Sequence, residues 1–311
     1  MLSRFISCGA NANHANFAKF TNCLFSKFVE LVKFEKFALK KGRGCHSTFC
    51  THFLPFILLL CCSLSVAAKP ADTPESSVLF NQSVLMLDAG YASIHDSYLT
   101  PITYDGLDLG LSIEATRWVN HYRWLWQLGV GADYNYVENN AKNNELHKVM
   151  GDISFNMQHA WMGVLHSRLG FSAGPMAQLR AGIVYDAVNS NNPVTVRAHA
   201  NLGATGMAWF NTHLGRKPIT LRYQIQLPVM GVFFAPDYDE SYYEIYLGNH
   251  KNLAHMGWWG NRVDMTNYLG ADFNMGKVTL RLGYRNRLEH WNVNNLKVHD
   301  VSHSLVLGIT L

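Results

Sequence analysis

The sequence predicts an all-β fold: a transmembrane antiparallel up-and-down β-barrel of about ten strands, with twelve as the alternative count. Three observations lead to this prediction. Many segments alternate strictly between apolar and polar residues, as a strand does when its two faces meet different surroundings. Long and short connections alternate along the chain, which indicates long outer loops and short periplasmic turns. Aromatic residues gather at the strand ends, where a membrane interface would lie.

The first five strands are expected at 82–95, 107–118, 124–136, 149–162 and about 167–187. In each of them every second residue is apolar. The residues expected to face outward are Leu85, Leu87, Ala89 and Tyr91; Leu107, Leu109, Leu111, Ile113 and Ala115; Trp124, Trp126, Leu128, Val130, Ala132, Tyr134 and Tyr136; Ile153, Phe155 and Met157; and Leu169, Phe171, Leu179 and Ile183. The intervening positions are polar or small, so they are expected to face the lumen.

The second five strands are expected at 194–210, 219–229, 264–275, 278–290 and 299–311. The outward sets here include Val196, Ala198, Leu202, Ile219, Leu221, Tyr223, Ile225, Leu227, Val229, Val278, Leu280, Leu282, Tyr284, Leu305, Leu307, Ile309 and Leu311. The last strand also resembles the C-terminal signal that the barrel assembly machinery reads, although it ends in Leu311 rather than an aromatic residue. That machinery and outer-membrane lipid are the expected partners.

The connections divide into two classes. The long ones, expected outside, are 96–105, 137–148, 188–193, 234–262 and 291–298. The short ones, expected in the periplasm, are 119–122, 163–166, 211–217 and 276–277. A soluble β-sandwich or lipocalin-like barrel is the competing fold. It is disfavoured because Trp, Phe or Leu recurs on the outward face and charged residues are only 15% of the chain.

The chain changes composition near residue 69. Residues 1–68 contain all six cysteines and eight Lys/Arg against two Glu, whereas the remainder has eighteen Lys/Arg against twenty Asp/Glu. The net charge of +4 therefore belongs to the first part, and no nucleic-acid-binding surface is indicated. Because residues 69–311 contain no Cys, neither a disulfide framework nor a thiolate metal site is expected there, and no cofactor is expected.

Four segments are expected. Residues 40–68 read as a signal peptide, with basic Lys40, Lys41 and Arg43 before the apolar run 53–68. A transmembrane anchor and a lipoprotein signal cleaved before Cys61 are the alternatives. Residues 1–39 are interpreted as a disordered leader or an over-extended start, 69–80 as a short periplasmic segment, and 81–311 as the barrel. Export through the signal peptide to the outer membrane of a Gram-negative cell follows.

The inward positions carry many charges. The residues expected to form a lumen network are Asp108, Glu114, Asp133, Asp152, Arg168, Arg180, Arg197, Arg222, Asp272, Arg281 and Arg285, accompanied by Asp88, Arg123 and Arg287. Buried charges must be paired, so a cross-lumen network that fills a narrow barrel is the favoured interpretation. A narrow anion path lined by the arginines is the alternative.

The loop 234–262 concentrates catalytic residue types. The catalytic candidates are Ser241, His250, His255, Asp237 and Glu244, and the candidate binding surface is Tyr238, Tyr242, Tyr243, Trp258 and Trp259. A Ser–His–acid lipid hydrolase could be assembled here, but there is no Gly-x-Ser-x-Gly motif. The spacing of His250 and His255 is not a standard metal-ligand pair. The sequence favours a non-enzymatic role in envelope structure, surface recognition or narrow-solute passage.

Several blocks resemble a known family. LRYQIQLPVMGVFFAPDYDESYYEIYLGNH (221–250), AHMGWWGN (254–261), LTPITYDG (99–106) and NNPV (191–194) are similar to the signature of an uncharacterised domain-of-unknown-function group. Members of that group are outer-membrane β-barrel proteins of Gram-negative gut anaerobes. The resemblance covers most of 80–311 and implies export and a barrel. It brings no established activity and no catalytic residues.

Overall fold

The computed structural model of the protein describes residues 81–119, 123–164, 168–189, 193–215, 217–236, 242, 245, 253–275 and 278–310. Contacts divide the chain into two compact units, Met1–Val66 and Ala67–Leu311, and every described residue belongs to the second. The expected leader, signal peptide and periplasmic segment lie outside the described residues. Among the described residues, no helix is long and apolar enough to cross a bilayer.

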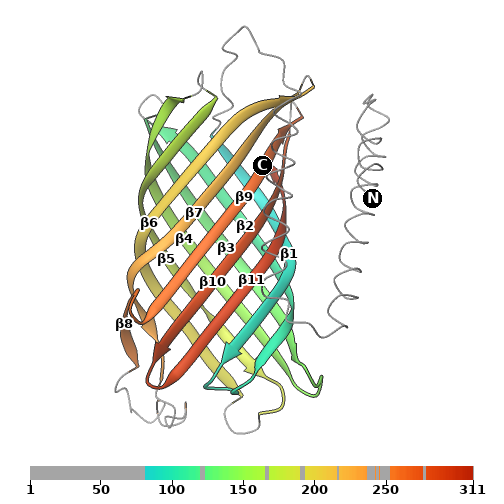
Figure 1. Cartoon of the computed structure of the whole chain (residues 1–311), viewed down its shortest axis with the longest axis vertical. Coiled ribbons are helices and arrows are strands. Elements are labelled where there is room, and N and C mark those ends of the chain that lie inside the picture. The colour runs from blue at the N-terminus through green and yellow to red at the C-terminus, as the bar shows by residue number, and fades with distance from the viewer. Residues whose placement is uncertain are drawn as a thin grey trace. The chain divides into compact units, whose positions relative to one another are not determined.

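The described chain is built from antiparallel strands (Figure 1). They are β1 (Gln82–Asp96), β2 (Thr103–Val119), β3 (Trp124–Asn139), β4 (Glu145–Val164), β5 (Leu169–Asp186), β6 (Val194–Leu214), β7 (Lys217–Phe234), β8 (Ala254–Trp258), β9 (Arg262–Asn274), β10 (Thr279–Val293) and β11 (Leu296–Thr310).

The sheet closes on itself. Its order is β6-β5-β4-β3-β2-β1-β11-β10-β9-β7-β8, and β6 also pairs with β7. The first and last strands are neighbours, with Leu85 opposite Ile309. Leaving out the short β8, the remaining ten strands form a closed ring, so the predicted up-and-down barrel and its strand number are confirmed. Closure removes the free strand edges that would otherwise invite aggregation.

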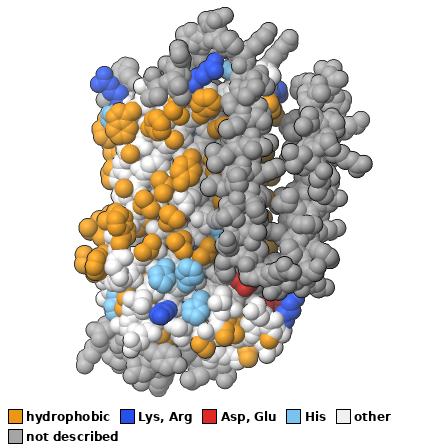
Figure 2. Space-filling model, in the orientation of Figure 1, with side chains coloured by type: hydrophobic (Ala, Val, Ile, Leu, Met, Phe, Trp, Pro, Cys, Tyr) orange, Lys and Arg blue, Asp and Glu red, His pale blue; other side chains and the backbone are white. Residues whose placement is uncertain are grey.

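The predicted alternation of faces is also confirmed. On β2, Leu107, Leu109, Leu111 and Ile113 are 43%, 40%, 51% and 44% exposed, while the intervening Asp108 is only 3% exposed. Large apolar side chains on other strands, such as Phe155 and Leu179, are exposed in the same way. Figure 2 shows this apolar exterior in orange, with Lys and Arg toward the two ends of the barrel. An oily outside around a polar inside is the arrangement of a membrane-spanning barrel.

Several expected connections are shorter in the structure, since 137–148 narrows to 140–144 and 211–217 to 215–216, and two others differ in kind. The outer connection predicted at 291–298 is wrong, because β10 and β11 extend until only Asn294 and Asn295 remain between them. Both residues have positive φ, 57° and 59°, as a two-residue type I′ hairpin requires. Asn adopts this conformation more readily than most residues, and that property is the signal that the sequence offered.

The connection predicted at 234–262 contains an additional strand. β9 pairs with β7 from Ile219 to Gln226, and β8 continues along the same edge of β7 from Met230 to Phe234. Between β8 and β9 the chain turns, with Asn261 N donating to Trp258 O at 2.9 Å. In the barrel wall, β9 and β8 therefore share the place of one strand. β9 lies beside the first half of β7, β8 lies beside its second half, and residues 259–261 connect the two.

Tight curvature depends on small inward residues. At Gly174 in β5, an added Cβ would lie 2.0 Å from Met157 O on the neighbouring β4. That contact is far inside van der Waals distance, so only glycine lets the two backbones approach this closely. Glycine in a strand interior commonly marks such a bend.

Candidate functional site

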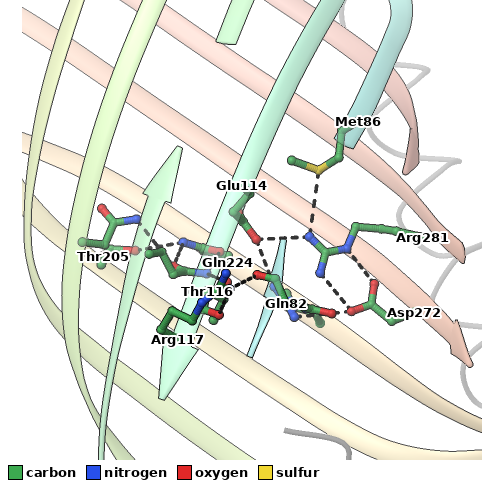
Figure 3. A network of polar contacts seen from close by, with 12 residues as sticks. Gln82, Met86, Glu114, Thr116, Arg117, Thr205, Gln224, Asp272 and Arg281 are labelled. Atoms are coloured by element: carbon green, nitrogen blue, oxygen red, sulfur yellow. Dashed lines mark hydrogen bonds and ion pairs between the residues drawn. The ribbon is translucent and has the colours of Figure 1, made fainter. Parts of the chain in front are cut away.

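The lumen contains a buried ionic cluster near the turn end of the barrel (Figure 3). Arg281 Nε and Nη2 donate to the two carboxylate oxygens of Asp272 at 2.7 and 3.0 Å, and Arg281 Nη1 donates to Glu114 Oε1 at 3.1 Å. Arg222 donates to the same two carboxylates, each at 3.3 Å. With its amide oxygen facing the guanidinium groups, Gln82 accepts from Arg222 at 2.9 Å and from Arg281 at 2.8 Å. Two cations thus share two anions.

A cluster of uncharged amides lies beside these ions. Gln127 Oε1 accepts from Gln158 Nε2 at 2.8 Å and from Gln224 Nε2 at 2.9 Å. Gln158 Oε1 in turn accepts from Ser172 Oγ at 2.7 Å. These side chains come from four different strands, β3, β4, β5 and β7, so the cluster ties opposite walls of the barrel together.

A second layer of ions crosses the middle of the lumen. Asp133 accepts from Arg180 and, at 3.0 Å, from Arg287 Nη1. Asp88 pairs with Arg285. The carboxylate of Asp108 has no guanidinium partner in the described structure, and instead it accepts from Asn135 Nδ2 at 2.5 Å and from Ser304. Hydrogen bonds alone can hold a buried carboxylate in this way.

A third layer lies toward the outer end. Its ion pairs are Arg197–Asp96 at 2.8 Å, Lys148–Asp300 at 2.7 Å, Arg197–Asp300 at 3.6 Å, Arg262–Asp264 at 2.8 Å and Arg262–Glu289 at 3.3 Å. Asn201 Nδ2 also donates to Asp264 at 2.9 Å. In all three layers the cations have carboxylate partners. An anion that entered the lumen would have to compete with these carboxylates for the same guanidinium and ammonium groups.

Buried apolar side chains gather toward both ends of the lumen. At the outer end, Phe233, Trp291, Leu296 and Val298 form one buried cluster with Ala235. A second outer cluster consists of Ala92, Ile94, Leu99, Tyr104, Val137, Leu146 and Val184. At the turn end, Leu125, Ala160, Met207 and Trp209 pack together, with Trp118 against them. The charged layers therefore lie between apolar clusters at the two ends.

Two small cavities lie between the ionic layers. One cavity, of ≈ 40 Å³, lies between the outer and middle layers and is lined by Asp264 and Asp300 among others. A second, of ≈ 70 Å³, lies between the middle and turn-end layers and is lined by Ser112 and Tyr268 among others. At roughly 10–15 Å³ for each water, these volumes correspond to a few water molecules. Asp264 Oδ1, Asp300 Oδ1, Ser112 Oγ and Tyr268 OH lack protein partners, and they suit water of this kind.

Part of the long outer loop is fixed to the barrel by Tyr242. Val196 N donates to the Tyr242 hydroxyl at 2.6 Å, and Thr195 Oγ1 lies 3.1 Å from it. The ring also meets Tyr98 edge-on, with centroids 6.1 Å apart. Burial raises the pKa of the Tyr242 hydroxyl, which therefore stays neutral. This side chain joins the loop to β6 and to the β1–β2 connection.

Of the other described loop residues, one is held by contacts within the protein and two expose their rings. His255 Nε2 lies 3.0 Å from Ala235 O and 3.2 Å from Asn294 Nδ2, so its ring is held by structural contacts. Trp258 and Trp259 are instead 61% and 58% exposed. Trp259 Nε1 donates to Pro228 O at 2.8 Å, which fixes the ring while its face stays open. Exposed, fixed aromatic rings are suited to an interface between lipid and water.

The remaining loop candidates, Asp237, Tyr238, Ser241, Tyr243, Glu244 and His250, lie outside the described residues. Within the described residues, no three His, Cys, Asp or Glu side chains come together in a metal-binding arrangement.

The expected lumen residues differ in how closely they contact other charges. Asp152 is more loosely held than the others, 3.9 Å from Arg287. Arg168 and Arg123 lie in the turns that precede β5 and β3, and no ion pair joins either of them to the described lumen carboxylates. Both were assigned inward by extending the alternation past the strand end. The sequence reasoning missed Asp96, Lys148, Arg262, Asp264, Glu289 and Asp300, which form the outer layer. Asp96, Lys148 and Arg262 lie in strand ends beyond the predicted bounds, whereas Asp264, Glu289 and Asp300 occupy inward positions within the predicted strands and were left out of the expected network.

Fold and interior together define a closed ten-stranded barrel with an apolar exterior and many ion pairs in its lumen. The chain belongs to the DUF3316 family, described as a protein of unknown function, whose family model matches residues 55–311. No curated protein matches the chain.

Several solved structures are similar. Neisserial surface protein A is 12% identical, with a TM-score of 0.31 over 74% of this chain and 97% of that chain. The translocator domain of the autotransporter NalP from Neisseria meningitidis is 8% identical, with a TM-score of 0.33 over 83% and 95%. The outer membrane protease OmpT from Escherichia coli is 8% identical, with a TM-score of 0.33 over 76% and 99%.

Proposed function

We propose that the protein is an outer-membrane barrel that acts through its outer face, as a rigid platform for surface recognition, and not as a passage for solutes. The observation that carries this proposal is the closed lumen. Apolar clusters lie toward both ends, and the cavities between the ionic layers include two of ≈ 40 and ≈ 70 Å³, which supports a lumen without a wide passage. A solute larger than water would have to break buried ion pairs, and breaking one such pair typically costs about 3–5 kcal/mol.

The membrane location is supported by the exterior. Leu111, Ile153 and Leu179 are each about half exposed, and a soluble surface rarely presents apolar side chains in such a continuous band. The expected signal peptide at 40–68 would deliver the chain to the periplasm. From there, outer-membrane lipid and the assembly machinery are the partners that such a barrel requires.

The outer face is the part suited to recognition. Tyr242 anchors the loop between β7 and β8 to the barrel wall, while Met256, Trp258 and Trp259 are exposed next to it. Functional residues are often carried on loops that a rigid scaffold positions. The ion pairs and amides beneath supply that rigidity, because they connect strands from opposite walls.

Conductance across a planar bilayer tests the closed lumen. The purified full chain is expected to produce no steady single-channel steps at any applied voltage, whereas a known porin inserted under the same conditions will. Steady steps from this protein would overturn the proposal. In a second arm, an epitope placed within 237–250 should be labelled on intact cells, and the same epitope at 276–277 only after permeabilisation. The reverse labelling would contradict the assigned orientation.

A further inference from the structure

The outer layer of the lumen contains more carboxylates than cations. Its described ion pairs join four carboxylates to three cations, namely Asp96, Asp264, Glu289 and Asp300 to Lys148, Arg197 and Arg262. Each of these side chains is at most 11% exposed. If all of them were ionised, the layer would hold an uncompensated negative charge, and burying such a charge is costly. A single proton bound within the layer would make it neutral.

The shortage of positive charge falls on two carboxylates that face each other. Asp264 on β9 lies directly opposite Glu289 on β10. Both contact the same guanidinium, that of Arg262, at 2.8 and 3.3 Å. The other two carboxylates of the layer lie beside the other two cations. Like charges directly opposite each other on paired strands are destabilising, so this pair is where a proton would stabilise the layer most.

The hydrogen bonds of the pair indicate which member holds the proton. Glu289 also lies 4.0 Å from Arg197 and 3.9 Å from His199 Nδ1, so positive or polar groups surround it. At Asp264 the contacts are one-sided. Oδ2 accepts from Arg262 Nε at 2.9 Å, from Arg262 Nη2 at 2.8 Å and from Asn201 Nδ2 at 2.9 Å, whereas the buried Oδ1 has no protein partner. A carboxylic acid suits this arrangement, because its carbonyl oxygen only accepts and its hydroxyl oxygen donates.

The surroundings of Asp264 offer an acceptor for such a proton and no further cation. Asp264 lines the ≈ 40 Å³ cavity, where a water molecule can accept from a protonated Oδ1. Besides the outer-layer groups and His199, the charged side chains that line this cavity are Asp108 of β2, Asp133 of β3, Arg180 of β5 and Arg287 of β10. Both of these arginines contact Asp133, so the described ion pairs of the middle layer leave no cation for Asp264.

We propose that Asp264 is a proton-binding site of the lumen. In the folded barrel its Oδ1 holds a proton taken from solvent at a pH where ordinary carboxyl groups are ionised, and Arg262 then neutralises Glu289 alone. A proton fits the site better than a metal ion, because no three His, Cys, Asp or Glu side chains of the described chain meet in a metal-binding arrangement. This site is independent of surface recognition, and either proposal can fail without the other.

The site gives the outer end of the barrel a response to pH. When the pH rises and the proton leaves, the two carboxylates compete for Arg262. The guanidinium of Arg262 lies 5.0 Å from the centre of the Phe233 ring, at the end of β7 from which the long outer loop departs. Loss of the proton therefore acts on the part of the wall that carries this loop.

Infrared spectroscopy of the full chain in lipid vesicles detects the proton directly, because a carboxylic acid and a carboxylate absorb at different frequencies. At about pH 5.5, roughly one unit or more above the ordinary pKa of Asp and Glu side chains, the wild type should show a carboxylic acid band that Asp264→Asn lacks. Asp105→Asn, the same change on the outward face of β2, is the matched control and should keep the band. Absence of the band from the wild type would overturn the inference, whatever the variants do.

The pH dependence of unfolding is the second measurement. A carboxyl group that keeps its proton in the folded state and loses it on unfolding makes the folded state bind more protons. The stability of the wild type relative to Asp264→Asn should therefore decline as the pH rises from about 4 to about 8, with a slope of at most about one proton. If Asp264 were ionised and needed by Arg262, the relative stability of the wild type would instead rise over this range, and that result would overturn the inference. A decline that His199→Gln removes and Asp264→Asn keeps would place the proton on His199 and would also overturn it.

Discussion

Arg281 is the largest fully buried side chain of the described barrel, at 1% exposed. Its guanidinium meets Asp272 through two hydrogen bonds and Glu114 through a third. Removing a single partner leaves uncompensated buried charge, whereas removing a matched pair leaves the remaining ions balanced. Variants of this cluster can therefore distinguish the cost of an unpaired buried charge from the cost of removing a whole ion pair.

We expect Arg281→Met to lower the free energy of unfolding by about 3–5 kcal/mol, because Arg222 alone must then neutralise both carboxylates. The double variant Arg281→Met/Asp272→Leu should recover much of this loss, since Arg222 and Glu114 remain paired at 3.3 Å. Urea unfolding in lipid vesicles measures both, with the exposed Arg123→Met as the control. A double variant no more stable than Arg281→Met alone would show that the ions do not act as a balanced set.

The sequence predicts which face of the barrel a charged residue occupies, but it does not predict its ion-pair partner. The side of the barrel that Asp108 or Arg222 faces follows from the period of two, because a strand alternates its faces. The partner of each charge does not follow, because pairing across a lumen depends on strand stagger, which no local pattern specifies. The strand end is a related difficulty: Arg168 has the parity of an inward residue, but β5 begins one residue later.

At the scale of elements, the hairpin between β10 and β11 turns on Asn294 and Asn295, both in the left-handed region. Alanine at position 295 would have to adopt a conformation that places its Cβ too close to backbone atoms, whereas glycine has no Cβ. We expect Asn295→Ala to lower the free energy of unfolding by about 1–2 kcal/mol and Asn295→Gly to leave it nearly unchanged. Equal losses in the two variants, measured by the same unfolding assay, would argue against the I′ turn.

The same hairpin and β8 show why element boundaries are hard to predict. Polar residues such as Asn292 and Lys297 look like loop residues, yet they pair with each other across β10 and β11. Beyond the membrane an outward strand position is free to be polar, so the alternation signal disappears while the ladder continues. β8 escaped prediction because it is only five residues long and its place along β7 depends on the insertion at 259–261.

For the whole molecule, the deciding question is which medium meets the outward face. Two outward positions on β2 can answer this question. Leu111 lies at the midpoint of the strand and Val119 at its end, and their side chains are 51% and 42% exposed. In a bilayer, an arginine near the midplane costs about 2–4 kcal/mol, and one near the interface costs about 0–1 kcal/mol. In water, either substitution would replace an exposed apolar side chain by a soluble one.

We therefore expect Leu111→Arg to lower the free energy of unfolding in lipid vesicles by about 2–4 kcal/mol, and Val119→Arg to change it by less than about 1 kcal/mol. The two variants introduce the same side chain on the same strand and face, so the change in net charge is the same in both. Equal effects at the two positions, or a gain in solubility without detergent for Leu111→Arg, would mean that the apolar band does not face lipid. A graded loss from the centre of β2 to its end would locate the bilayer along the barrel directly.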